Sequence, residues 1–500
     1  MHFNIKNILK TQGFETENEH KVIYISLYKA LKESITKRVL NENSKLPPTR
    51  ILAQDLRISR STVLKAYDLL VLEKYIKSIP GSGYFVATIK TKKIHHNLSS
   101  NLDHGKYPSI SKRARAFERN IQIINKIPDV GLAFRPGLPP LDIFPVHQWQ
   151  NLTNNYWKTV TSSELSYSHT TGLECLRNNI SNYLKIYRNI NCEADQILIT
   201  TGSLHSLYLA SDSLVDKNDE VIVENPTYPY ANGLFNSLEA RIIPAGLDDE
   251  GILINNVKCN KPKLIYTTPS AQFPTGIKMS INRRLELLKW ASNKNAIIIE
   301  DDYDHEFSNW VNPISSLFSL DREERVIYLG TFNKLLHPSI RLGYMIIPRH
   351  LLRTINTLHE QSYRFVSPTL QKILSAFIEK DFLNKHLRKV IETSMERKKV
   401  FFNTFNSRFE NEISLDSNRT ENVGLHVIGD LKEKLNDLKL TSFLSSKGIT
   451  THSYSSCFIH GKKKHGLIMG YNSINNKLIK DNIDIMHAAY IEFLKFDKKT

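Results

Sequence analysis

Residues 328–334 read YLGTFNK, an apolar run followed by a small polar turn and a lysine. The apolar part is typical of a buried strand, so we expect Lys334 just past a strand end, where functional groups collect in parallel sheets. Burial and nearby cations lower the pKa of a lysine and make it a nucleophile toward an aldehyde. Because most lysines are solvated surface groups, this interpretation needs companion residues.

On both sides of this stretch, from Gly131 onward, apolar runs alternate with helix-like segments. The alternation predicts an α/β domain built on a mostly parallel sheet, followed after about residue 370 by a smaller α+β part that is rich in helix. The expected strands are residues 196–200, 221–223, 264–266, 296–299 and 326–329.

Two candidate companions of Lys334 follow the strand-like run that ends near residue 299. Asp301 and Tyr303 are two residues apart, so their side chains point the same way in an extended chain. A carboxylate in this place can keep a pyridinium nitrogen protonated, and a phenol can hydrogen-bond a ring hydroxyl. The neighbouring Asp302, Asp304 and Glu306 are expected to be solvated.

Further companions suit a phosphate and a flat ring. Thr201-Gly202-Ser203 lies between a strand and a helix-like segment, and the amides at a helix N-terminus favour an anion. Arg341 can add a bidentate cation to the same phosphate, and Tyr228 offers a ring for stacking. Each signal is weak alone, whereas the ordered set indicates a cofactor site.

The first 90 residues predict a separate helical module. Thr49 is expected to cap a helix over residues 50–56, and Ser59 a helix that runs to about Glu73. Two short helices joined by a tight turn form a helix-turn-helix, whose second helix enters the DNA major groove. An earlier helix within residues 22–45 has one apolar face, formed by Ile25, Tyr28, Leu31, Ile35 and Val39.

The last of these helices and the segment after it carry groups suited to DNA. Arg60, Ser61, Thr62 and Lys65 gather near the start of the helix, and these residue types contact bases and phosphates. Residues 75–87 hold a Pro-Gly-Ser-Gly turn between two strand-like runs, which predicts a β-hairpin wing.

Charge and composition favour a nucleic-acid partner. The chain has 67 Lys+Arg and 50 Asp+Glu, a formal net charge of +17, and the first 120 residues carry +12 of it. Residues 89–127 are basic and polar without apolar periodicity, which predicts a linker. Four cysteines without a CxxC pair and the lack of a long apolar run predict a cytoplasmic protein with no metal site and no membrane span.

The amino-terminal module resembles the winged helix-turn-helix of GntR-type bacterial regulators. The matching stretches are LPPTR (46–50), SRSTV (59–63), AY (66–67), YI (75–76) and GSGYFV (81–86). Pro48 stands where the family often has serine. The resemblance implies that residues 1–88 bind double-stranded operator DNA through Arg50, Ser59, Arg60, Thr62, Gly81 and Gly83.

The rest of the chain resembles the fold type I aminotransferases that depend on pyridoxal 5′-phosphate (PLP). Fused to the winged helix, it resembles the MocR/GabR subfamily of GntR regulators. The resemblance implies that Lys334 forms a Schiff base with PLP, that Asp301 pairs with the pyridine nitrogen, and that Tyr303 meets the ring oxygen. It implies further that Tyr228 stacks on the ring and that Ser203, Thr331 and Arg341 hold the phosphate. The stretches that carry it are FRPGLPPLDIFP (134–145), residues 167–188, TTGS (200–203), ENPTY (224–228), TPSAQFPTG (268–276), EDDYDHEF (300–307), GTFNK (330–334) and RLGY (341–344).

The resemblance also implies a domain plan. The winged helix occupies residues 1–88, a basic linker 89–127, and the PLP-binding domain 128–500. Within the last of these, the large part covers about 150–365 and the small part about 366–500.

Three departures from the family pattern bear on the site. Ala271 replaces a usual histidine, and Asn333 a usual serine before the lysine. Aminotransferases hold the substrate carboxylate with a carboxy-terminal arginine, and the corresponding stretch GLIMGY (466–471) contains none. The candidate replacements are Arg419, His452, Lys464 and His465.

Three functions are compatible with these features. The first is a homodimeric, PLP-dependent transcription regulator that senses PLP or an amine or amino acid effector through an aldimine at Lys334. The second is a catalytically active aminotransferase with an appended DNA-binding module. The third is a sensor of PLP alone. The complete and basic DNA-binding module favours regulation over catalysis.

Overall fold

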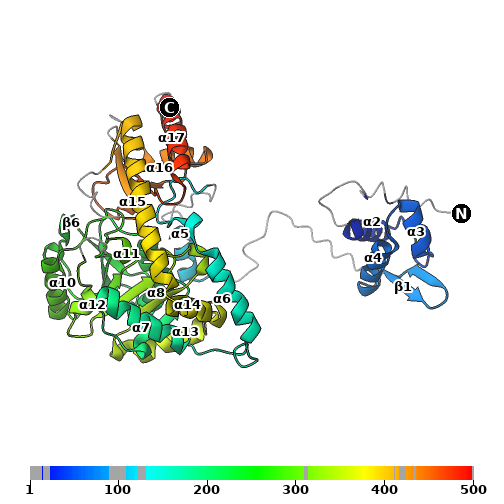
Figure 1. Ribbon diagram of the computed structural model, residues 1–500, viewed down its shortest axis with the longest axis horizontal. Helices are drawn as coiled ribbons and strands as arrows, with labels where there is room; N and C mark the ends of the chain where they lie inside the picture. Colours follow the sequence, from blue (N-terminus) through cyan, green and yellow to red (C-terminus); the bar gives the residue numbers. More distant parts are fainter. Residues whose placement is uncertain are drawn as a thin grey trace. The chain divides into compact units, whose positions relative to one another are not determined.

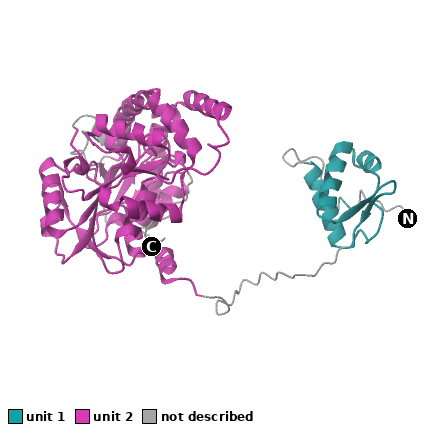
Figure 2. Ribbon diagram, turned by 90° about the horizontal axis from the view of Figure 1, so that it is seen from below, with its two compact units in different colours: residues 1–108 teal, residues 109–500 magenta. Residues whose placement is uncertain are grey.

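The computed structural model describes residues 9, 14, 23–88, 109–120, 131–308, 313–409, 412–415, 424–431 and 435–497. The chain divides into two compact units, residues 1–108 and residues 109–500, which Figure 2 colours separately. Each unit has its own hydrophobic core, so each can be understood from its own sequence.

The first unit is a helix-turn-helix with a two-stranded wing, as the sequence predicts (Figure 1). The strands pair antiparallel, with Ile76 opposite Val86. Buried side chains from every element, among them Leu31, Val63 and Leu70, form the core. The elements are α2 (Ile23–Thr36), α3 (Thr49–Leu56), α4 (Arg60–Leu72), β1 (Ile76–Ile79) and β2 (Gly83–Val86).

Two local predictions in this unit were wrong. Thr49 is the first residue of α3 and does not cap it, because Pro48, whose fixed φ of −54° suits a helix start, takes the cap position. Val39 lies beyond the end of α2 and is 38% exposed, so the buried face of that helix is not the predicted one. That face consists of Leu27, Ala30, Leu31, Ser34 and Ile35. The predicted cap at Ser59 is confirmed, since its hydroxyl accepts from the Thr62 amide at 3.1 Å.

The second unit is built on a seven-stranded sheet in the order β3-β11-β10-β9-β8-β4-β5. The strands from β10 to β5 pair parallel, and β11 runs antiparallel to both of its neighbours. This confirms the mostly parallel sheet; β5 and β11 are strands that the sequence analysis did not identify. The bounds are β3 (Ile197–Thr200), β4 (Glu220–Glu224), β5 (Arg241–Ala245), β8 (Pro262–Thr267), β9 (Ile297–Asp301), β10 (Val326–Thr331) and β11 (Gly343–Ile346).

Helices cover both faces of the sheet because alternate strand residues point to opposite sides. On one face, Ile197 and Tyr328 pack against α6, α7, α14 and α15, and α10 and α12 cover the rest of that face. On the other face, Leu198 and Ile327 pack against α8, α9 and α13. The bounds are α6 (Val146–Thr159), α7 (Glu174–Arg188), α8 (Ser203–Leu214), α9 (Pro229–Ser237), α10 (Ile281–Lys294), α11 (His305–Ser308), α12 (Leu317–Leu320), α13 (Leu352–Ser362), α14 (Pro368–Glu379) and α15 (Phe382–Phe409).

A four-stranded antiparallel sheet, β12-β13-β15-β14, forms the smaller part of this unit. Its core includes the second half of α15, which lies beside α17 in Figure 1, and also Ala133 and Phe134 from far upstream in the sequence. The elements are β12 (Ile413–Leu415), β13 (Val427–Leu431), α16 (Asp437–Ser446), β14 (His452–Ser453), β15 (Gly466–Met469) and α17 (Asn476–Asp497). A minor hairpin of the large part joins β6 (Leu247–Asp248) to β7 (Gly251–Ile252).

The structure differs from the predicted linker, residues 89–127, within residues 109–120. Helix α5 (Lys112–Asn120) belongs to the second unit and contacts α9. Asn120 is 7% exposed, and its amide donates to the Gly233 carbonyl at 2.8 Å and to the Ser237 hydroxyl at 2.6 Å. Polar contacts hold this helix, so apolar periodicity could not reveal it. Among the described residues, no helix is long and apolar enough to cross a membrane.

Candidate cofactor site and DNA-binding surface

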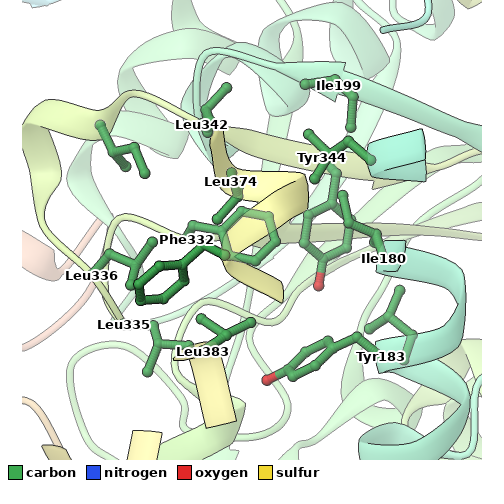
Figure 3. Packing of buried hydrophobic residues seen from close by; sticks show 14 of the residues in the cluster. Ile180, Tyr183, Ile199, Phe332, Leu335, Leu336, Leu342, Tyr344, Leu374 and Leu383 are labelled. Carbon is green, nitrogen blue, oxygen red and sulfur yellow. The ribbon is translucent and has the colours of Figure 1, made fainter. Parts of the chain in front are cut away.

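Lys334 is anchored at the carboxyl edge of the large sheet by its neighbours in the chain. Phe332, Leu335 and Leu336 are buried in the core shown in Figure 3, so the turn after β10 is fixed on both sides of the lysine. The Lys334 ammonium donates to the Gly137 carbonyl at 3.0 Å. Burial lowers the pKa of Lys334 and Arg135 adds to this, while Asp304 and Asp301 oppose it. The amine is therefore closer to its nucleophilic neutral form than a surface lysine.

Asp301 ends β9, which is paired parallel with β10, so both chains leave the sheet at the same edge. One carboxylate oxygen of Asp301 accepts from the Tyr266 hydroxyl at 2.8 Å. The other oxygen is buried and has no partner among the described residues, and the same is true of the Tyr303 hydroxyl. Burial raises the pKa of Asp301 to about 6, against the effect of the Tyr266 hydrogen bond.

The predicted phosphate ligands come together through the order of the strands. Gly343 of β11 lies opposite both Thr331 of β10 and Thr200 of β3, so the ends of these three strands are adjacent. Gly202, with φ +119°, precedes α8 and its Ser203. A Cβ at Gly202 would lie 3.0 Å from the Asn333 amide nitrogen and 3.8 Å from an Arg341 guanidinium nitrogen. The arrangement is a cradle of backbone amides, hydroxyls and one guanidinium at a helix N-terminus.

Tyr228 belongs to a group of aromatic rings at the start of α9. Its ring centroid is 5.3 Å from that of Tyr230 and 5.4 Å from that of Phe273. The Phe273 ring also lies 6.4 Å from the Tyr303 ring and 5.2 Å from the His426 ring. The Phe273 ring therefore lies near both Tyr228, predicted to stack on the cofactor ring, and Tyr303, predicted to meet the ring oxygen; sequence reasoning did not assign this position to Phe273.

A phosphorylated pyridine aldehyde fits these residues. Two buried polar atoms without partners among the described residues, on Asp301 and Tyr303, are an acceptor and a donor suited to a protonated ring nitrogen and a ring oxygen. The cradle at Gly202 suits a phosphate, and Lys334 supplies an amine. The role of each residue toward the cofactor stays a prediction.

The expectation that Asp302 and Asp304 are solvated was wrong, since each is 1% exposed. Asp302 accepts from the Arg188 guanidinium and from the Tyr328 hydroxyl, both at 2.6 Å. Burial acts to raise the pKa of Asp302, but the Arg188 charge outweighs it and brings that pKa to about 2. Arg188 and Asp302 are 114 residues apart, so sequence spacing carried no sign of the pair.

The predicted DNA contacts lie at the starts of α3 and α4 and in the hairpin turn of the first unit. Arg50 and Arg60 are exposed near the starts of α3 and α4, and the Arg60 guanidinium donates to the Thr49 hydroxyl at 3.4 Å. Ser59 caps α4, and its hydroxyl also lies 2.6 Å from the Thr62 hydroxyl. In the wing, Gly81 and Gly83 have φ values of +76° and +107°, and Gly81 has open space around it. The wing tip thus allows close approach of a backbone.

Comparison with known proteins agrees with both halves of this description. The profile of the family "Aminotransferase class I and II" matches residues 145–435, and that of "Bacterial regulatory proteins, gntR family" matches residues 23–86. The chain is 30% identical, over 93% of each chain, to a probable rhizopine catabolism regulatory protein, MocR, of Rhizobium meliloti.

A second relative and a solved structure are also similar to this chain. The chain is 25% identical to the pyridoxine biosynthesis transcriptional regulator PdxR of Corynebacterium glutamicum, over 91% of this chain and 93% of that one. An archaeal alanine:glyoxylate aminotransferase superimposes with a TM-score of 0.69 at 23% identity, over 78% of this chain and all of that one, which shows the fold.

A winged helix-turn-helix joined to an α/β domain of aminotransferase fold defines a class of DNA-binding transcription regulator. The chain belongs to the MocR type of GntR regulators, whose aminotransferase-like domain uses pyridoxal 5′-phosphate as its cofactor.

Replacing Tyr266 tests the polar environment of Asp301. Tyr266→Phe keeps the ring and removes the hydroxyl that donates to the carboxylate, so the pKa of Asp301 should rise further above about 6. We expect the pH midpoint of the absorption spectrum of the PLP-loaded protein to rise by about 1 unit. Tyr328→Phe removes the matching hydroxyl from Asp302 and serves as the control. Equal shifts in the two variants, or none in Tyr266→Phe, would contradict the assignment of Asp301.

Replacing Arg60 tests the DNA-binding surface. Arg60→Ala should weaken binding of the operator duplex about tenfold and make it less dependent on salt, because one cation no longer displaces counterions. Fluorescence anisotropy at several salt concentrations measures both effects, and the cofactor spectrum should not change. Arg322→Ala removes an exposed arginine of the second unit and should leave DNA affinity as it is. If the two variants lose affinity equally, Arg60 has no specific role.

Proposed function

We propose that this regulator senses PLP, or an amine or amino acid that reacts at the cofactor, through the amine of Lys334. The observation that carries the proposal is the placement of Lys334. A partly buried amine with a lowered pKa lies at the sheet edge where Asp301 and Tyr303 have polar atoms without partners among the described residues. The same chain carries a DNA-binding module, so binding of a ligand at this site can change the affinity of the protein for DNA.

Each residue of the site has a distinct task in this proposal. PLP, when bound, supplies an aldehyde carbon that an amine can hold covalently and a ring that withdraws electrons. The Lys334 nitrogen holds the cofactor, Asp301 accepts from its ring nitrogen, and Tyr303 donates to its ring oxygen. Tyr228 stacks on the ring, and Ser203, Thr331 and Arg341 bind the phosphate. When an effector amine holds the cofactor instead, the Lys334 amine would be able to donate to the Gly137 carbonyl, as it does in this structure.

Helix α5 supports a route from this site toward the DNA-binding module. It contacts α9, which starts directly after Tyr228, through Asn120. Arg113 forms an ion pair with Asp212 of α8 and donates to the Tyr208 hydroxyl of α8 at 3.0 Å, and α8 starts at Ser203. A shift of either helix on ligand binding therefore reaches the segment that leads to the linker, and this biases one of two domain arrangements.

The proposal includes a homodimer in the cytoplasm, where the operator is. Large apolar side chains support a dimer because they are exposed on the second unit, including Trp157 at 55%, Leu165 at 59% and Tyr167 at 74%. Two copies bring two winged helices, which then read two half-sites separated by a whole number of DNA turns.

A second candidate function is that of a sensor of PLP alone, and the sequence in and after β15 favours it. Ile468 of that strand is fully buried in the small part, and residues 466–471 hold no arginine for a substrate carboxylate. Of the replacements considered from the sequence, Lys464 is exposed and Arg419 lies outside the described residues. The relative named as a pyridoxine biosynthesis regulator supports this candidate. DNA affinity that responds to PLP and to no amine would favour it.

Steady formation of a keto acid from an amino acid would instead favour the third candidate, an active aminotransferase.

A visible absorption titration with PLP tests the covalent site. The wild type should shift the absorption band to a longer wavelength than that of free PLP, and Lys334→Ala should not, because the proposal assigns the covalent bond to the lysine amine. Lys278→Ala, which removes a nearby half-buried lysine, is the matched control and should keep the band. A band of equal strength in Lys334→Ala would mean that another amine holds the cofactor.

A further inference from the structure

Helix α4 exposes a large apolar side chain in its first two turns. Leu64 is 44% exposed and is not among the residues that form the core of the first unit. The buried side of the helix, which packs in that core, consists of Val63, Ala66, Tyr67 and Leu70. Leu64 therefore contributes little to the fold. Because single exposed leucines are common, the surroundings of Leu64 must decide what this side chain does.

The polar side chains at the start of α4 contact one another and α3. The Ser59 hydroxyl accepts from the Thr62 amide, and it lies 2.9 Å from the Ser61 hydroxyl and 2.6 Å from the Thr62 hydroxyl. The Arg60 guanidinium donates to the Thr49 hydroxyl of α3 at 3.4 Å. These contacts hold hydroxyls and one cation at the end of the helix, and such groups usually bind DNA phosphates and fix the position of a protein on the duplex.

Leu64 lies one helical turn further along, on the side of α4 that also carries Arg60 and Asp68. Residues four apart in a helix share one side, and four residues advance about 6 Å along its axis. Asp68 is exposed, and its carboxylate repels phosphates but can accept from the amino group of cytosine. The surface that Leu64 and Asp68 form beyond Arg60 therefore suits base edges better than the DNA backbone.

A leucine can recognise one feature of a base pair in the major groove. The groove is about 12 Å wide and admits a helix, and the C5 methyl of thymine is the apolar group that it presents. Contact between the two removes apolar surface from water, which favours thymine over bases without the methyl group. The second helix of a helix-turn-helix enters this groove with its amino-terminal residues against the base edges, and Leu64 is in that part of α4.

We propose that Leu64 determines sequence specificity by packing against the C5 methyl group of a thymine in the operator. This inference goes beyond the proposed function, because it concerns how the DNA-binding module reads its site and not which ligand controls it. It adds a base contact to those predicted from the sequence. The sequence did not indicate Leu64, because a leucine has no charge or hydrogen-bonding group that marks it as a DNA contact.

Replacement of thymine by uracil tests the proposal, because uracil pairs as thymine does and lacks the methyl group. The probe is a duplex that the PLP-loaded full-length protein selects from a random library, and each of its thymines is replaced singly by deoxyuridine. Fluorescence anisotropy measures the Kd of each duplex. With the wild type, replacement of the contacted thymine should raise the Kd about fourfold, the factor that burial of one methyl group supplies.

Variants at two leucines of α4 identify the residue responsible. Leu64→Ala keeps the helix, since alanine is the best helix former, and it should bind the thymine and uracil duplexes equally. Leu64→Met keeps an apolar side chain and should retain most of the preference for thymine. Leu72→Ala is the matched control, because Leu72 is 77% exposed at the other end of the same helix. This variant should prefer thymine as the wild type does.

Three results would overturn the contact. The wild type could bind every uracil duplex as tightly as the thymine duplex, or Leu64→Ala could keep the full preference at the sensitive thymine. Loss of the preference in Leu72→Ala as well would assign the effect to the helix and not to a base contact. Each of these results leaves ligand sensing at Lys334 as it was, because the experiment holds the cofactor constant and compares DNA duplexes.

Discussion

The parallel pairing of β9 with β10 is the constraint on which the site depends. With Leu329 opposite Asp301, both strands end at one edge, and Lys334 follows in the next turn of the chain. Successive side chains of a strand face opposite sides, so Asp301 turns toward Tyr266 and Asp302 toward Arg188 and Tyr328. A slip of one residue would exchange these two carboxylates. The acid in the position proposed for the cofactor's partner would then be the one already paired with an arginine.

The buried acids at this edge differ in how far neighbouring groups already compensate their charge. Glu300 accepts from the backbone amides of Leu317 and Phe318, each at 2.9 Å, and lies beside Arg284. Asp302 is paired with Arg188, a guanidinium that is itself buried. Asp301 has one neutral hydroxyl donor, so burial raises its pKa to about 6, and one of its oxygens has no partner within the described part of the chain. A buried carboxylate without full compensation costs stability, and in the proposed function a protonated ring nitrogen would supply the missing partner.

Sequence reasoning located the features that depend on local pattern. The five strand-like runs, the Ser59 cap and the wing all follow from spacing and turn residues, and the structure has each of them. Sequence reasoning could not identify Tyr266 as the partner of Asp301, or Arg188 as the partner of Asp302. The fold brings the residues of each pair together from elements that are distant in sequence. Sequence reasoning did not predict helix α5, because its buried residues, Ala116 and Asn120, form no apolar stripe.

The central claim is that the Lys334 site controls DNA binding, and operator affinity tests it most directly. The measurement is anisotropy of a labelled duplex from the protein's own operator, with wild type and Lys334→Ala, in the presence and absence of PLP and an amine that shifts the cofactor band. We predict that the ligands change the DNA affinity of the wild type and leave that of Lys334→Ala unchanged. Equal responses of the two proteins, or no response of the wild type, would contradict the account.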